Sequence, residues 1–295
     1  MKKKIMIIGN GQLGKTLFQI LKKTKFKIKL YTKKKVDFLI PSQIKNEIKD
    51  LKPDYVINCS ALTNVPLCEI EKKKAKKINS LALYYLGKLS KSLNFKLIHF
   101  STDYVFNGKK KNSYKEADKV NPINFYGYSK MLGEKELKKI GCSYFIFRIS
   151  WVYNNFGNNF FLKIIKKILD KKISKINVVK DQIGIPTSTK FVAKAINYLL
   201  ERGFFNNPSN FGIYHLVPHG QTTWFNFAQM IEKFILKKKK IKSKSKIKPI
   251  LTAEFMSNIK RPLNGVLNNS KFIKKTNYKI YNWKKYLIEE MESTI

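Results

Sequence analysis

Cysteine, histidine, arginine and acidic residues are all scarce in this chain of 295 residues. The three cysteines (Cys59, Cys68 and Cys142) are odd in number and have no CxxC spacing, and the three histidines form no cluster with them. Such a set cannot build the disulfide framework of a small secreted protein or a typical structural zinc site. We therefore expect reduced thiols, no metal ligands and a cytoplasmic protein.

Long apolar runs are also absent. No stretch approaches the roughly 18 apolar residues that a transmembrane helix needs, so we expect no membrane insertion. Hydrophobic residues still make up 43% of the chain and aromatic residues 13%, which is enough for a packed core and argues against disorder.

The formal net charge of +41 is carried almost entirely by lysine, because only Arg148, Arg202 and Arg261 are arginines. Planar recognition of phosphates and base edges favours arginine. The lysines are spread over the whole chain among many Asn, Ile, Phe and Tyr residues, a mixture typical of an AT-rich coding sequence. We expect a solvated lysine-rich surface and no specific nucleic acid partner. Weak, salt-sensitive binding of polyanions is the alternative.

Short apolar runs alternate with helical patterns in the first half of the chain. The runs predict strands at Ile5–Ile8, Ile28–Tyr31, Tyr55–Asn58, Leu97–Ser101 and Tyr144–Ile149. The segments between them predict helices near Leu13–Lys23, Ser42–Leu51, Lys74–Leu93 and Asn124–Lys139. Because buried parallel strands appear as continuous apolar runs, the pattern predicts an α/β fold with a Rossmann-type doubly wound parallel sheet.

After Ile149 the pattern changes to aromatic residues, turns and shorter elements. It predicts a strand at Ile176–Val179 and helices near Asn159–Leu169, Thr189–Arg202 and Phe225–Leu236. We assign residues 1–149 to an NAD(P)-binding Rossmann domain and residues 150–295 mainly to a smaller α/β substrate-binding lobe. Segments within about 174–203 are expected to return to the Rossmann sheet.

A glycine-rich turn lies between the first predicted strand and the first predicted helix. Gly9, Gly11 and Gly14 form a G-x-G-x-x-G pattern in the strand-turn-helix context that a dinucleotide site requires. Glycine lets the backbone approach a pyrophosphate, whose charge is met by the helix N-terminus. An ordinary tight turn is the alternative explanation of this pattern alone.

The end of the second predicted strand indicates which cofactor is preferred. An acidic residue usually accepts the ribose hydroxyl of NAD at this place, but the sequence has Lys33–Lys35 there and no carboxylate before Asp37. Lysines tolerate or favour a 2′-phosphate, so NADPH is expected. NADH stays open, because lysine fills surface positions throughout the chain.

Three residues form a candidate site for reduction of a carbonyl group. Tyr126 and Lys130 are four residues apart on a predicted helix, which places a phenol and an ammonium on one face, where the cation can lower the pKa of the phenol. Thr102 follows a strand and can donate to a carbonyl oxygen that becomes negative as hydride arrives. We assign Tyr126 as the acid, Lys130 as its partner that also contacts cofactor ribose, and Thr102 as the orienting donor. A packed tyrosine and a solvated lysine are the alternative.

The sequence resembles the extended short-chain dehydrogenase/reductases, and within them the dTDP-4-dehydrorhamnose reductases. The segments that carry the resemblance cover nearly the whole chain: Gly9–Gly14, Ser101–Phe106, Tyr126–Lys130, Gly133–Lys135, Arg148–Tyr153, Asp181–Ser188, Gly212–Leu216 and Arg261–Asn264. The resemblance implies NAD(P)H-dependent reduction of the C4 ketone of dTDP-4-dehydro-6-deoxy-L-mannose to dTDP-L-rhamnose. It implies a role in nucleotide-sugar biosynthesis for cell-surface polysaccharide, such as lipopolysaccharide.

The resemblance also implies site residues. Thr102, Tyr126 and Lys130 are the implied catalytic group, and Thr102, Asp103, Trp151 and Arg261 contact the sugar nucleotide. The implied cofactor-binding residues, besides Tyr126 and Lys130, are Gly9, Gly11, Gln12, Leu13, Gly14, Asp37, Phe38, Ala61, Leu62 and Thr63. The glycine turn is one residue shorter than is usual in this group.

Members of this family often have acidic residues at a magnesium site associated with a dimer. Those residues cannot be placed in this sequence, so magnesium and a homodimer both stay open and no metal ligand is assigned. Two other functions also stay open. One is a reductase or epimerase for another nucleotide 4-keto-sugar, and the other is a noncatalytic NADP-binding protein that regulates a partner enzyme.

Overall fold

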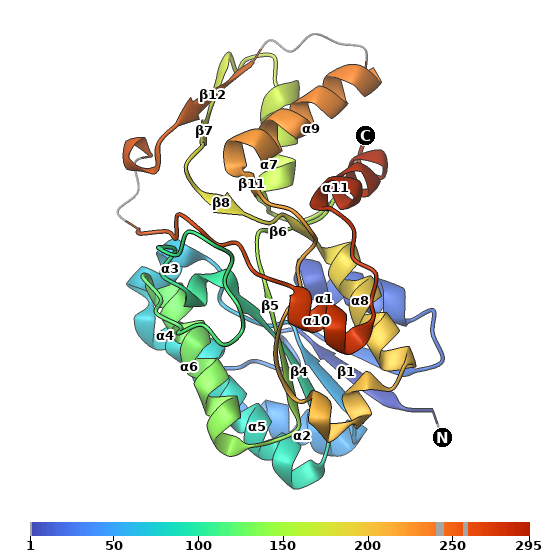
Figure 1. Ribbon diagram of the computed structural model, residues 1–295. Coiled ribbons are helices and arrows are strands. Elements are labelled where there is room, and N and C mark those ends of the chain that lie inside the picture. The colour runs from blue at the N-terminus through green and yellow to red at the C-terminus, as the bar shows by residue number, and fades with distance from the viewer. Residues whose placement is uncertain (1, 240–244, 256–258) are drawn as a thin grey trace.

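A six-stranded parallel sheet forms the centre of the larger lobe (Figure 1). The structure is a computed structural model that describes residues 2–239, 245–255 and 259–295. The strands lie in the order β10 (Gly212–His215), β5 (Tyr144–Ile149), β4 (Lys96–Thr102), β3 (Tyr55–Asn58), β1 (Lys4–Ile8) and β2 (Lys27–Tyr31). All five strands predicted in the first half of the chain are present in this sheet, so the doubly wound parallel sheet is confirmed.

The strand order reverses direction next to β1. The chain starts at β1, adds β2 on one side, and then continues with β3, β4 and β5 on the other side. In an open parallel sheet, ligands bind in the crevice beyond the carboxyl ends of the strands at such a reversal. The topology therefore places a candidate site beyond the ends of β1, β3 and β4.

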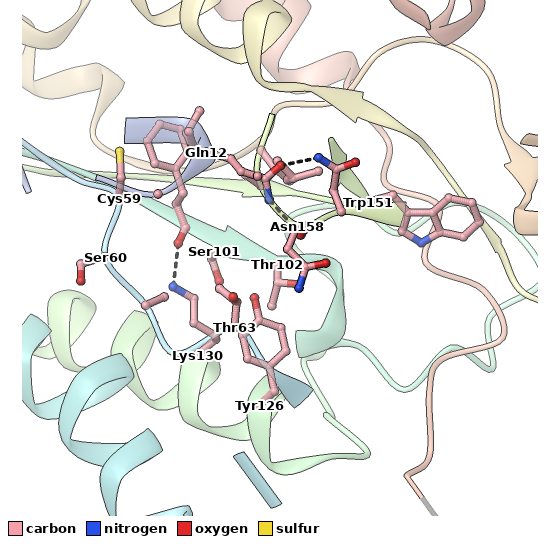
Figure 2. Close-up of a pocket in the computed structure, with 18 of the residues that line it drawn as sticks. Gln12, Cys59, Ser60, Thr63, Ser101, Thr102, Tyr126, Lys130, Trp151 and Asn158 are labelled. Carbon is pink, nitrogen blue, oxygen red and sulfur yellow. Dashed lines mark hydrogen bonds between the residues drawn. The ribbon is translucent and has the colours of Figure 1, made fainter. Parts of the chain in front are cut away.

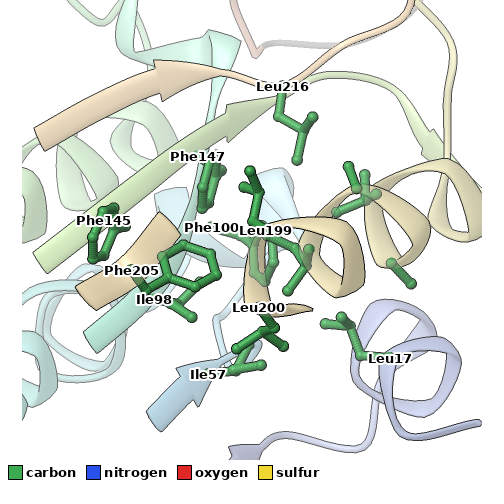
Figure 3. Packing of buried hydrophobic residues seen from close by; sticks show 14 of the residues in the cluster. Leu17, Ile57, Ile98, Phe100, Phe145, Phe147, Leu199, Leu200, Phe205 and Leu216 are labelled. Atoms are coloured by element: carbon green, nitrogen blue, oxygen red, sulfur yellow. The ribbon is translucent and has the colours of Figure 1, made fainter. Parts of the chain in front are cut away.

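The side chains of each central strand alternate between two cores. Ile5 and Ile7 pack toward α1 (Gln12–Leu21) and α8 (Thr189–Glu201), whereas Met6 and Ile8 pack with α2 (Pro41–Leu51), α5 (Ala82–Leu93) and α6 (Phe125–Ile140). Figure 3 shows the first of these cores, with Leu17 of α1 facing strand residues such as Ile57. Both faces of the sheet are covered by helices, which explains why the central strands consist mainly of buried apolar residues.

The helix predicted at Lys74–Leu93 has three parts. It begins as α4 (Lys72–Lys76), continues through five residues in π-helical conformation at Lys77–Leu81, and ends as α5. Asn79 lies in the π-helical part, where its side chain accepts a hydrogen bond from the backbone N–H of Leu62 and donates one to the carbonyl of Leu62. The irregular segment thereby fixes the loop that follows β3.

The smaller lobe has its own core. Its main elements are α7 (Phe160–Leu169), β7 (Lys175–Val179), α9 (Trp224–Lys239), β12 (Lys246–Ile250) and α11 (Trp283–Glu292). Ile164, Val178, Ile231 and Leu287 are buried together in this core. The shorter elements are α3 (Val65–Ile70), β6 (Val152–Tyr153) paired with β9 (Thr187–Ser188), β8 (Ile183–Gly184) paired with β11 (Thr222–Thr223), and α10 (Ser270–Thr276).

The segments near 174–203, which the sequence predicts to return to the Rossmann sheet, divide between the two lobes. The strand in that range, β7, pairs with β12 in the smaller lobe, whereas the helix α8 packs against the sheet through Phe191 and Val192. The sixth strand of the sheet is β10, outside that range. The apolar pattern of β7 shows that the strand is partly buried but cannot show which partner it pairs with, because pairing depends on distant residues.

Within the described part of the chain, no helix is both long enough and apolar enough to cross a membrane.

Candidate active site

A pocket of about 630 Å³ lies between the two lobes, at the carboxyl ends of β1, β3 and β4. Its volume is within the range of small-molecule sites, about 300–1,000 Å³. The predicted residues that line it are Gly11, Gln12, Leu13, Ala61, Thr63, Thr102, Asp103, Tyr126, Lys130 and Trp151. Figure 2 shows Lys130 and Tyr126 rising from α6 toward one side of the pocket, with Gln12 and Trp151 on other walls. The structure thus brings the glycine turn and the Tyr126–Lys130 pair to one cavity.

Gly9 and Gly14 shape the turn from outside the pocket lining. Gly9 has a φ of +100°, and a Cβ on Gly14 would lie 1.8 Å from the carbonyl oxygen of Gly9. A side chain at either position would push the turn away from the sheet. The N-cap of α1 is Gly11, which offers no capping side chain, so the first N–H groups of the helix can meet an anion.

Tyr126 lies on the first turn of α6, with its ring edge-to-face against Tyr104 at 5.7 Å between ring centroids. Burial raises the pKa of the Tyr126 phenol well above its ordinary value, and the hydroxyl of Thr102 opposes this rise. Thr102 itself donates to the carboxylate of Asp103 (3.0 Å) and accepts the backbone N–H of Tyr104 (3.2 Å). The phenol is therefore protonated and able to act as an acid at neutral pH.

Lys130 is fully enclosed and turned toward the sheet. Its Nζ lies 2.7 Å from the carbonyl oxygen of Phe100 and 2.8 Å from Nε2 of His99. Burial lowers the pKa of Lys130 to about 7, although Glu134 and Cys59 act in the opposite direction. The expectation that Lys130 lowers the pKa of Tyr126 is not met in this state, because the lysine has buried partners of its own and burial dominates the pKa of the phenol.

Asp103 is a buried carboxyl group at the floor of the pocket. Only 2% of the residue is exposed, and burial raises its pKa to about 7 despite hydrogen bonds from Thr102 and from backbone N–H groups. Gly265 lies against the carboxylate, where a Cβ would come within 2.4 Å of Oδ2. Asp103 is thus held between the strand end and a loop of the smaller lobe.

Trp151 and Trp224 form an aromatic wall of the pocket. Their rings are stacked with 3.6 Å between centroids and 8° between planes. Trp151 has a φ of +44°, and Gly184 leaves room for its indole, since a Cβ there would lie 2.3 Å from the ring. Sequence reasoning missed Trp224, which is 73 residues further along the chain and has no motif around it.

Gln12 bridges the two lobes. Its side-chain oxygen accepts a hydrogen bond from Asn159 (2.8 Å), and its amide nitrogen donates to the carbonyl of Asn158 (3.4 Å), as Figure 2 shows. Asn159 also caps α7 by accepting the N–H of Leu162. The sequence predicts the helix that begins near Asn159, but it does not mark Asn158 or Asn159 as site residues.

Besides Gly9 and Gly14, four predicted site residues lie outside the pocket lining: Asp37, Phe38, Leu62 and Arg261. Asp37 accepts the backbone N–H of Leu39 (2.9 Å) and pairs with Lys33 (3.7 Å). Phe38 is buried in the core beneath β2, and Leu62 is held by Asn79. Arg261 is half-buried near Tyr104. Among the described residues, no group of three or more His, Cys, Asp or Glu side chains could hold a metal ion.

Comparison with known proteins identifies relatives along almost the whole chain. Residues 3–294 match the family model described as "RmlD substrate binding domain". The chain is 33% identical over 290 residues to the spore coat polysaccharide biosynthesis protein SpsK of Bacillus subtilis (strain 168), covering 98% of this chain and 97% of that protein. It is 33% identical over 236 residues to the dTDP-4-dehydrorhamnose reductase of Escherichia coli (strain K12), covering 80% and 78% of the two chains.

A solved structure agrees with these sequence matches. The dTDP-4-dehydrorhamnose reductase of Bacillus anthracis str. Ames, solved in complex with NADP, superposes with a TM-score of 0.90 and 32% identity over 100% of both chains. The similarity therefore includes both lobes and the cleft between them.

Proposed function

The chain belongs to the RmlD substrate binding domain family, and from this premise we propose that it is an NADPH-dependent reductase of a dTDP-4-keto sugar. The reaction is reduction of the C4 ketone of dTDP-4-dehydro-6-deoxy-L-mannose to give dTDP-L-rhamnose. The observation that carries the proposal is the meeting of Thr102, Tyr126 and Lys130 with the glycine turn around one pocket. The three unpaired cysteines fit a cytoplasmic site of action.

The residues present fit a nicotinamide dinucleotide. The N-terminus of α1 offers backbone N–H groups to a pyrophosphate, and Gly11 adds no side chain that would block the approach. When bound, the reduced nicotinamide supplies hydride to the carbonyl carbon. NADP is bound in the related structure from Bacillus anthracis.

Lysines near the end of β2 support a preference for NADPH over NADH. The backbone N–H of Gly9 donates to the carbonyl of Tyr31 (2.9 Å), so the glycine turn lies beside the end of β2. Lys33 and Lys34 follow within three residues, and the side chain of Lys33 is 72% exposed. Asp37 is the first carboxylate after β2, and it lies beyond these lysines, where it accepts the N–H of Leu39 and pairs with Lys33.

The protein side chains would manage the proton and the developing negative charge. Tyr126 gives its proton to the carbonyl oxygen as hydride reaches the carbon, and Thr102 turns the hydroxyl hydrogen that it gives to Asp103 in this structure toward the same oxygen. Lys130 stabilises the phenolate that is left behind. Trp151 offers its indole face to the sugar nucleotide, and Asp103 and Arg261 are proposed as further substrate contacts.

The test is oxidation of NADPH, followed by its absorbance, when the purified protein is mixed with the keto sugar made by upstream enzymes. Tyr126→Phe should lower kcat by at least about 100-fold, since it removes the acid, while the affinity for NADPH stays within about twofold. Tyr128→Phe is the matched control, because Tyr128 lies two residues along α6 and is 43% exposed. Binding of NADPH without any turnover would favour the noncatalytic regulator, and turnover only with other nucleotide sugars would favour a different substrate.

A further inference from the structure

A row of buried polar side chains connects the backbone that follows β3 to Lys130 of the catalytic pair. Asn58 on β3 and His99 on β4 are directly opposite each other in the register of the parallel strands, and both are about 1% exposed. Asn58 Nδ2 lies 3.1 Å from His99 Nδ1, and His99 Nε2 lies 2.8 Å from Lys130 Nζ. The three side chains therefore form one line under α6.

A backbone hydrogen bond fixes the direction of this line. The N–H of Ser60 donates to Oδ1 of Asn58 at 2.9 Å, so the amide oxygen of Asn58 faces Ser60 and its NH₂ group faces His99. An amide NH₂ can only donate, and therefore Nδ1 of His99 accepts from it. The backbone of Asn58 acts in the opposite direction, because its contact with the imidazole favours a protonated ring. In a neutral imidazole the single proton is then on Nε2.

The proton on Nε2 determines the protonation state of Lys130. An Nε2–H group pointing at Nζ needs a lone pair on the lysine, and only the neutral amine has one. The neutral amine still has hydrogens to donate to the carbonyl of Phe100, 2.7 Å away. Burial also holds the pKa of His99 well below its ordinary value, which keeps the imidazole neutral.

We propose that His99, oriented by Asn58, is a positioning residue that holds Lys130 as the neutral amine when the lysine is turned toward the sheet. The inference rests on the proposed function for its catalytic meaning. When the Lys130 ammonium returns a proton to the Tyr126 phenolate, one N–H bond breaks and one O–H bond forms, and the neutral amine that remains takes its hydrogen bond from His99. Solvent then supplies the next proton to Lys130.

The charged and titratable groups around Lys130 raise or lower its pKa. Glu134 on α6 and Cys59 after β3 both favour the ammonium, and Glu134 is largely neutralised by its ion pair with Arg148 on β5. His99 Nε2–H is the group that stabilises the neutral form. Reversing its tautomer should therefore raise the pKa of Lys130.

The substitution Asn58→Asp reverses the tautomer while keeping the shape of the side chain. A carboxylate still accepts from Ser60 but can only accept from the imidazole, so the proton of His99 moves to Nδ1 and Nε2 becomes an acceptor for the Lys130 ammonium. Asn79→Asp is the matched control, since Asn79 is a buried asparagine under the same helix that bonds Ser129 and Leu62 but not His99.

The first measurement is the ¹⁵N NMR spectrum of the histidine side chains in the full-length protein without added ligand, with His99 assigned by its loss in His99→Gln. We expect His99 as the Nε2–H tautomer in the wild type and in Asn79→Asp, and as the Nδ1–H tautomer in Asn58→Asp. A wild-type His99 that is Nδ1–H or doubly protonated overturns the proposal, whether or not the protein is a reductase.

The second measurement is the pH profile of kcat for NADPH-dependent reduction. One hydrogen bond gained or lost changes a pKa by about half a unit to one unit, so the alkaline fall in kcat should move upward by that amount in Asn58→Asp and stay in place in Asn79→Asp. An unmoved profile with a reversed tautomer overturns the link to Lys130. Absence of turnover in the wild type, with the expected tautomers, contradicts the proposed function alone.

Discussion

Trp151 and Trp224 lie face to face at 3.6 Å between ring centroids, and they join the strand end after β5 to the first residue of α9. Both line the pocket, so the stack presents a rigid aromatic wall to whatever binds between the lobes. Trp151 has a left-handed backbone conformation (φ +44°), which is strained for a residue other than glycine. Stacking against Trp224 helps to hold Trp151 in this conformation.

We expect Trp224→Leu to raise KM for the sugar nucleotide about tenfold and to change kcat less than about threefold. The substitution removes an aromatic contact worth roughly 1 kcal/mol or more and lets Trp151 move, but it touches no group that exchanges protons. Steady-state kinetics would measure both constants. Phe225→Leu, the next residue on α9 and outside the pocket lining, is the control, and equal effects of the two substitutions would contradict the role of Trp224.

The buried carboxyl group of Asp103 should make stability depend on pH. Its pKa rises from 3.8 to about 7 on folding, so between these values the folded state holds a proton that the unfolded state releases. Stability from this group is therefore present below about pH 4 and is lost as the pH rises to 7. Asp103→Asn cannot ionise, so its melting temperature relative to the wild type should increase from pH 4 to pH 8.

Asp118→Asn is the control of opposite sign. Lys110 and the backbone N–H of Lys115 hold the pKa of the Asp118 carboxyl below its ordinary value, so its stabilisation is present at neutral pH and lost in acid. Thermal melts between pH 4 and pH 8 would measure the effect of Asp103→Asn, and melts continued below pH 4 would measure that of Asp118→Asn. If the difference in melting temperature between Asp103→Asn and the wild type stays constant with pH, Asp103 is not buried as described.

The ion pair of Arg148 and Glu134 anchors the catalytic helix to the sheet. The guanidinium binds the carboxylate through two hydrogen bonds of 2.9 and 2.6 Å, and both side chains are at most 4% exposed. His215 lies 3.4 Å from the guanidinium, and its pKa is lowered to about 3 by burial and by Arg148, so it carries no charge at neutral pH.

We expect Glu134→Gln to lower the free energy of unfolding by about 3–5 kcal/mol, because it leaves a buried guanidinium without a counter-ion. Urea denaturation would measure the change. Glu289→Gln, which breaks the exposed pair with Lys194, should cost less than about 1 kcal/mol. Similar losses of unfolding free energy in the two variants would mean that water solvates the Arg148–Glu134 pair as it does an exposed pair.

The lysines after β2 should set the preference between NADPH and NADH. Replacing Lys33 and Lys34 together by alanine should lower kcat/KM for NADPH about tenfold through lost charge-assisted contacts and leave kcat/KM for NADH within about twofold. Alanines at Lys22 and Lys23, exposed at the far end of α1, control for the loss of two positive charges. An unchanged ratio of the two cofactors would remove these lysines from the cofactor site.

The sequence by itself determined five of the six strands of the sheet and one half of the pocket. Continuous apolar runs predicted β1, β3, β4 and β5 because strands buried on both faces have no polar alternation. Local spacing predicted that Tyr126 and Lys130 share a face of α6, and the glycines predicted a turn at the end of β1 because their backbone conformation and clearance are local properties.

Only the tertiary structure decided which residues complete the pocket and which residues contact Lys130 from the sheet. The pairing of β7 with β12, the stack of Trp224 on Trp151 and the bridge from Gln12 to Asn159 all join residues that are far apart in sequence. The direction in which Lys130 points was decided in the same way, because its spacing fixed the helix face but His99 and Phe100 on β4 supplied its partners. Contacts across long separations depend on how whole elements pack, and no local pattern records that packing.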